Sequence, residues 1–160
     1  MTHEVSRPIS VDRLPASLIV EATAVECAAL AVRLGIPDVV RLSCKFALTR
    51  RGAVVQADGQ LKAEVVQSCV VSLEPVDQEV LEQFVVRFVP AGRESDDADP
   101  EAPDEIPYEG SIIDLGEAAA EQLALALDPY PRLLDAELHP AALDEAVNPF
   151  GSLSALRPTE

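Results

Sequence analysis

The segment between residues 41 and 89 constrains the fold most, because its hydrophobic residues recur with the period of β-strands. Its runs rich in valine, leucine and phenylalanine are 41–49, 53–57, 60–67 and 78–89. In the third run Leu61, Ala63 and Val65 alternate with charged residues, which is typical of a strand with one buried face. The segment therefore predicts an antiparallel β-meander.

Two short polar segments separate these runs. Arg50-Arg51-Gly52 lies between the first and the second run, and Asp58-Gly59 lies between the second and the third. Glycine readily adopts the positive φ that tight hairpin connections require. Both segments are therefore predicted to be turns.

A helix is predicted immediately before the strand-like region, over residues 23–34. Thr23 and Glu26 have the spacing of a capping box, in which each side chain binds the other residue's free backbone N–H. Gly35, followed by Pro37, is a typical helix end.

A second helix is predicted after that region, over residues 114–127. Asp114 is a suitable N-cap, and Leu115, Ala118 and Leu123 begin a periodic hydrophobic face. A third, short helix is expected over residues 140–147, before Asn148-Pro149.

Residues 94–109 combine eight acidic residues with three prolines. Such a segment repels itself and has little to bury, so we expect a disordered acidic loop. A divalent-metal site is the alternative, but the spacing lacks the glycine-turned geometry of a calcium loop.

These elements together predict the α+β class: one domain over residues 1–150, in which an antiparallel β-meander sheet is flanked by two or three helices. We expect residues 151–160 to form a frayed C-terminal tail.

The charge balance limits the partners of this chain. It has 12 basic and 28 acidic residues and a net charge of −16, so it will not coat nucleic acid or anionic lipid nonspecifically. The first residues lack the features of a secretory signal, and no apolar window is long enough to span a membrane. We therefore expect a soluble, cytoplasmic protein with no membrane partner.

No catalytic motif accompanies this composition. The three cysteines are widely spaced, and His3 and His139 lie at opposite ends of the chain. The sequence has no nucleophile elbow, zinc-protease motif or phosphate-binding glycine loop. We expect no enzyme activity, no catalytic residue and no cofactor.

The stretch from Val65 to Val76, VVQSCVVSLEPV, resembles the signature of the YceD-like family, the large-subunit ribosomal RNA accumulation proteins. The residues that carry this signature are Cys69, Leu73, Glu74 and Pro75. Further pieces follow the family's order at residues 6–15, 113–131 and 148–150. The resemblance spans most of the chain.

One departure from the family pattern bears on metal binding. Many relatives carry a Cys-x-x-Cys here, with further cysteines downstream, which would suit zinc. This chain has Ser72 at the second position and no cysteine over residues 130–138. Serine is a poor zinc ligand, so we predict no metal and a packing role for Cys69 at a strand end.

The resemblance implies a non-enzymatic ribosome-biogenesis factor that supports accumulation of large-subunit ribosomal RNA. An acidic body suits a basic client, either a ribosomal protein or an assembly factor. Glu117 and Glu121, on the predicted second helix, are the candidate contacts for that client. The oligomeric state is left open.

An alternative is direct RNA binding through the strand region, residues 41–93, which is close to neutral. Its candidate contacts are Arg50, Arg51, Lys62 and Arg87. A metal-dependent hydrolase that uses the acidic segment is a third reading, and it lacks both a nucleophile–base pair and metal-ligand spacing.

Overall fold

The computed structural model describes residues 3–96 and 99–138 of the chain. Its elements, in chain order, are β1 (Pro8–Ser10), the 3-10 turn η1 (Val11–Arg13), β2 (Ser17–Glu21), α1 (Ala24–Leu34), β3 (Asp38–Arg51), β4 (Val54–Ser68), β5 (Pro75–Pro90), β6 (Asp104–Tyr108), β7 (Ile112–Asp114) and α2 (Leu115–Ala126). The predicted third helix over 140–147 and the predicted tail over 151–160 lie outside the described residues.

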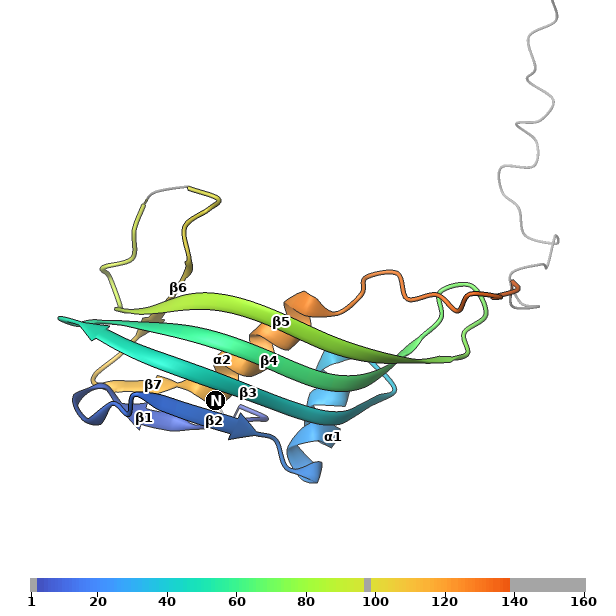
Figure 1. Ribbon diagram of the computed structural model, residues 1–160, viewed down its shortest axis with the longest axis horizontal. Coiled ribbons are helices and arrows are strands. Elements are labelled where there is room, and N and C mark those ends of the chain that lie inside the picture. The colour runs from blue at the N-terminus through green and yellow to red at the C-terminus, as the bar shows by residue number, and fades with distance from the viewer. Residues whose placement is uncertain (1–2, 97–98, 139–160) are drawn as a thin grey trace, which may run out of the picture.

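A five-stranded sheet in the order β2-β3-β4-β5-β6 forms the body of this single α+β domain, and β1 and β7 make a separate two-stranded sheet. Both helices lie on one side of the large sheet, behind its long strands in Figure 1. Helix α1 packs against β3, and α2 packs against β4 and β5. One face of the sheet is therefore covered, and no described element covers the other.

The predicted sheet is wrong at one strand: β6 runs parallel to β5, so the sheet is mixed rather than antiparallel. This strand also corrects the prediction of a loop over residues 94–109, because Asp104–Tyr108 are ordered as β6. Ile106 packs against the core and Tyr108 is buried, with its hydroxyl donating to the Ala53 carbonyl. Burial of these two side chains outweighs the charge repulsion of their neighbours.

The predicted turn at Asp58-Gly59 is also wrong, because β4 runs without interruption from Val54 to Ser68. Gly59 is needed for close approach rather than for a turn. A Cβ built on it would lie 2.2 Å from Cζ of Phe84, whose ring packs edge-on against Phe46. The other predicted turn, Arg50-Arg51-Gly52, is confirmed at Gly52, which follows β3 with φ of 63°, whereas Arg50 and Arg51 are part of β3.

Both predicted helices are confirmed with their caps. Thr23 and Glu26 form the capping box of α1, and Gly35 closes that helix in the left-handed conformation. The Asp114 carboxylate caps α2 by accepting from the N–H groups of Gly116 and Glu117. On α2 the buried face is Leu115, Gly116, Ala118, Ala119, Ala120 and Leu123. The glycine and the three alanines of this face let the helix lie close to its neighbours.

The N-terminal segment is packed beneath α2. Strand β1 pairs with β7, and Asp114 also accepts hydrogen bonds from Ser6 Oγ (2.6 Å) and Arg7 N–H (2.7 Å). The Arg7 guanidinium forms a bidentate pair with Glu26, at 2.7 and 2.9 Å. This pair ties the N-terminal segment to the first turn of α1.

The Arg7–Glu26 pair predicts an acid-dependent loss of stability. The hydrogen bonds from Arg7 lower the pKa of Glu26 from 4.5 to about 2. A carboxylate with a lowered folded-state pKa stabilises the fold above its unfolded pKa, and that contribution is lost as the pH falls from about 4.5 to about 2. Glu26→Gln, which keeps a capping side chain, should therefore cost about 2 kcal/mol near pH 7 and progressively less in acid.

Urea unfolding of both proteins between about pH 7 and about pH 2.5 measures this difference. A gap between wild type and variant that stays constant over that range would show that the charge of Glu26 contributes nothing.

Candidate functional site

The uncovered side of the large sheet, here called the outer face, is an open surface on which side chains from several strands meet. Alternation along β3, β4 and β5 directs every second side chain to this face, with a bulge in β3 between Val39 and Arg41. The side chains of the face on these strands are exposed or partly exposed; they are Asp38, Arg41, Ser43, Lys45, Ala47, Thr49, Arg51, Val54, Gln56, Asp58, Gln60, Lys62, Glu64, Val66, Asp77, Glu79, Leu81, Gln83, Val85 and Arg87. Ile19 of β2 extends the face beside Lys45.

The outer face holds five basic and five acidic side chains, so it is neutral although the whole chain carries −16. Its basic residues are Arg41, Lys45, Arg51, Lys62 and Arg87, and its acidic residues are Asp38, Asp58, Glu64, Asp77 and Glu79. The negative charge of the protein therefore lies elsewhere on its surface.

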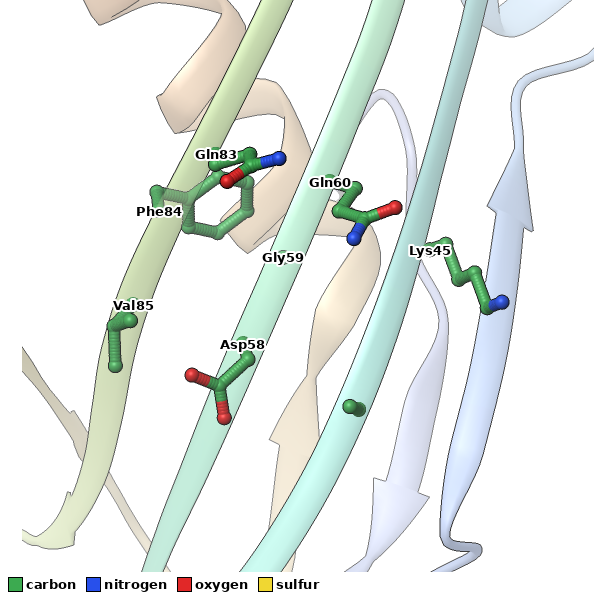
Figure 2. Close-up of a pocket in the computed structure, with 8 residues that line it drawn as sticks. Lys45, Asp58, Gly59, Gln60, Gln83, Phe84 and Val85 are labelled. Atoms are coloured by element: carbon green, nitrogen blue, oxygen red, sulfur yellow. The ribbon is translucent and has the colours of Figure 1, made fainter.

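Shallow hollows follow this face. The central one, of about 480 Å³, lies among Lys45, Asp58, Gln60, Gln83 and Val85, and Figure 2 shows these side chains spread over three adjacent strands. A second hollow of about 610 Å³ continues it toward Lys62 and Leu81.

The structure separates the candidate arginines of the β3–β4 turn. Arg50 is engaged within the fold, donating to the carbonyls of Gly52 (2.8 Å) and Val11 (2.9 Å) and pairing with Asp12 at 3.3 Å. Arg51 instead lines a hollow of about 260 Å³ together with Arg87 of β5. Arg51 and Arg87 were both predicted as candidate contacts from the sequence, and the strand register brings them to one hollow.

The remaining candidate contacts differ in their exposure and in their ion pairs within the protein. Lys62 lies 3.9 Å from Glu79 on the next strand, and both side chains are more than half exposed. Glu117 pairs with Arg33 at 2.7 Å and with His3 at 3.0 Å, and its side chain is only 15% exposed. Glu121, one turn later on α2, is exposed. Glu117 therefore serves internal packing, and Glu121 is the freer of the two carboxylates.

The signature residues form a compact corner after β4. Cys69 is fully buried, as predicted for a packing residue, and its N–H donates to the Glu74 carbonyl at 2.8 Å. Its Sγ accepts from the N–H groups of Ser72 and Leu133, each at 3.5 Å. Leu73 closes the turn with φ of 64°. Pro75 begins β5.

This corner joins two regions that are far apart in the sequence. Val70 N–H donates to the Pro131 carbonyl (2.9 Å), and the Gln67 side chain donates to the Asp128 carbonyl (2.9 Å). Hydrogen bonds from Ser72, more than those from other backbone groups, lower the pKa of the Cys69 thiol to about 6. The signature thus fixes the end of the β4–β5 hairpin to the segment that follows α2.

The acidic segment between β5 and β6 projects beyond the edge of the sheet (Figure 1). Its described carboxylates are Glu94, Asp96, Asp99 and Glu101, and the acidic residues continue with Asp104 and Glu105 in β6 and Glu109 after it. Three of these carboxylates accept backbone N–H groups, those of Gly92, Ser95 and Glu101. Over residues 3–96 and 99–138, the salt bridges use carboxylates from other parts of the chain.

The described part of the chain assembles no cluster of metal-binding side chains. Within it, no group of three or more histidine, cysteine, aspartate or glutamate side chains is placed to hold a metal ion. The prediction that the chain binds no zinc remains a prediction. None of the described helices has the length and apolar character needed to cross a membrane.

Comparison with known proteins identifies one family. A family model described as "Large ribosomal RNA subunit accumulation protein YceD" matches residues 57–156. That range includes the signature corner, α2 and most of β4 and β5. No curated protein and no solved structure matches the chain.

Proposed function

Because the chain belongs to the YceD family, whose name points to accumulation of large-subunit ribosomal RNA, we propose that it is a non-enzymatic ribosome-biogenesis factor that binds a basic protein client. The client is a ribosomal protein or an assembly factor. The acidic segment of residues 94–109 is the proposed contact, with Glu121 as an additional carboxylate.

The observation that carries this proposal is the projecting row of carboxylates between β5 and β6. Those described outside the segment include five that are paired with arginine or lysine, and those within it are free of such pairs in the described residues. Exposed carboxylates on a projecting segment steer a basic partner at long range and contact it with little desolvation cost.

RNA is the competing partner. The hollow that Arg51 and Arg87 share is its best contact on the sheet. However, Arg87 also lines an adjoining hollow together with Asp99, Asp104 and Glu105. The negative charges of these carboxylates would repel a phosphate backbone there. The observations therefore favour the protein client.

The test neutralises four carboxylates of the segment together, at Glu94, Asp96, Asp99 and Glu101. A matched control neutralises four exposed carboxylates elsewhere, at Glu21, Glu82, Asp135 and Glu137. Both variants have the same net charge, so they separate the location of the charge from its amount. Immobilised full-length protein is then titrated with the total protein extracted from large ribosomal subunits, and separately with deproteinised large-subunit RNA.

The expected result is salt-sensitive binding of basic proteins that the segment variant weakens about tenfold, equivalent to about 1.4 kcal/mol, and that the control retains. Tight binding of the RNA by wild type, abolished by Arg51→Glu with Arg87→Glu, would contradict the protein-client proposal.

A further inference from the structure

The two ends of the outer face differ in the sign of their charge, with Asp58 as the acidic residue of the basic half and Arg41 and Lys62 as the basic residues of the acidic half. At the end near the β3–β4 turn lie Arg51 and Arg87. At the opposite end, Glu64 and Glu79 face each other across β4 and β5, and Asp77 follows them. A neutral surface with positive charge at one end and negative charge at the other is complementary to itself when it is reversed.

The middle of the face carries exposed apolar side chains. Leu81 is 65% exposed, Val85 is 37% exposed and Ile19 is 59% exposed. Between them a row of longer polar side chains crosses the sheet, with Lys45 on β3, Gln60 on β4 and Gln83 on β5 (Figure 2). This central row is the natural position for a symmetry axis.

We propose that the outer face binds a second copy of this chain, in a twofold dimer that stacks the two large sheets face to face. The axis lies between the sheets, perpendicular to the strands, at the level of Gln60. Each strand then faces its own copy in the reverse direction, because a twofold rotation about this axis inverts the order of the rows.

The strand register determines which residues meet. On β5, a residue on one side of Gln83 faces the residue of the second copy that lies equally far on the other side. Arg87 therefore faces Glu79 of the second copy, and Val85 faces Leu81. Counting from Gln60 on β4, Asp58 faces Lys62. The twofold operation makes each of these contacts twice. The Lys62–Glu79 pair within one sheet, at 3.9 Å, then becomes part of a larger ion-pair network.

A second copy fits this face better than a polyanion or a strongly basic protein does. A phosphate backbone on this face would be repelled by its five carboxylates. A strongly basic protein would be repelled by its five cations. A partner that places positive charge opposite Glu79 and negative charge opposite Arg87 complements the face at both positions, and a reversed second copy supplies that pattern.

The size of the face predicts a weak dimer. From Arg51 to Asp38 it is about 40 Å long, and β3, β4 and β5 make it about 15 Å wide. Each copy therefore buries about 600 Å², at the low end for specific interfaces. Lys45 meets its own copy near the axis, and each chain carries −16, so repulsion further limits the affinity.

Sedimentation equilibrium of the full-length protein at physiological salt, from about 10 μM to about 1 mM, tests the proposal. We expect a concentration-dependent dimer. Arg87→Glu should weaken it at least tenfold, and Arg87→Glu with Glu79→Arg should restore it, because the exchange swaps the two charges of the same contact. Arg93→Glu, which makes the same charge change in the connection after β5, should leave dimerisation unchanged.

Lys45→Gln provides an opposite readout. Removal of the like-charge contact at the axis should strengthen the dimer about threefold. A protein that stays monomeric up to about 1 mM would overturn the proposal, as would a dimer insensitive to Arg87→Glu. RNA binding that Lys45→Gln weakens, without dimerisation, would instead assign the face to nucleic acid.

This proposal does not depend on the client of the acidic segment. Dimerisation is measured on the protein alone, and the variant that neutralises Glu94, Asp96, Asp99 and Glu101 should still dimerise. Failure of one proposal therefore leaves the other standing.

Discussion

Replacing Gly116 with alanine is expected to reduce the free energy of unfolding by about 3 kcal/mol. A Cβ at this position would lie 2.7 Å from the carbonyl oxygen of Val5 and 2.9 Å from the nitrogen of Arg7. Both contacts are with backbone atoms, which cannot move without breaking the packing of the N-terminal segment beneath α2. Alanine normally stabilises a helix relative to glycine, so the expected loss has the opposite sign to intrinsic propensity.

Urea unfolding of wild type and variant measures this loss, with Glu121→Ala as the control. Glu121 is exposed on the same helix, and its replacement should change the free energy of unfolding by less than about 0.5 kcal/mol. A Gly116→Ala protein more stable than wild type would show that the N-terminal segment does not pack on α2 in solution.

Replacing Gly59 with alanine is expected to cost about 2 kcal/mol, for a different reason. Here the new Cβ would contact the Phe84 ring, which lies edge-on to the Phe46 ring at a centroid distance of 5.8 Å. Phe84 cannot turn away without losing that contact and opening the covered side of the sheet. In an unobstructed strand, alanine in place of glycine would be stabilising.

A double-mutant cycle with Phe84→Leu isolates this clash. The smaller side chain should relieve the contact, so the double variant should be more stable than the sum of the single changes predicts, by at least about 1 kcal/mol. Strict additivity would mean that the Gly59 effect comes from the backbone alone.

Local chemistry made much of this fold readable from the sequence. The caps at Thr23, Gly35 and Asp114 act within one turn of the residues that form them, so both helices were predicted with nearly correct bounds. Alternation around Leu61 likewise identified strand structure, but β4 was predicted as two strands divided at Asp58-Gly59. These signals need no knowledge of which distant segment is the neighbour.

The errors arose where a distant contact decides the local structure. Asp58-Gly59 has the composition of a turn, yet the ring of Phe84 on the next strand is what requires a glycine there. Residues 104–108 have the composition of a loop, yet the burial of Ile106 and Tyr108 orders them as a strand along β5.

The charged residues of the candidate site could be predicted from the sequence, but their positions relative to one another could not. The near-neutral charge of the strand region could be counted from the sequence. Arg51, Lys62 and Arg87 were chosen as candidates from the basic residues of that region. Their placement on one face depends on the strand register, and the engagement of Arg50 depends on the nearby 3-10 turn. Nothing around Glu117 in the sequence indicates Arg33, which lies 84 positions away.

The pairing of β1 with β7 has a consequence for how the chain is made. The hydrogen bond between Arg7 and Asp114 spans 107 positions, so Arg7 waits about 5–20 s after its own synthesis before Asp114 is made. The β3–β4 and β4–β5 hairpins can form during that interval, because their strands are consecutive. The contacts of residues 5–10 with β7 and α2 therefore form last, after the hairpins.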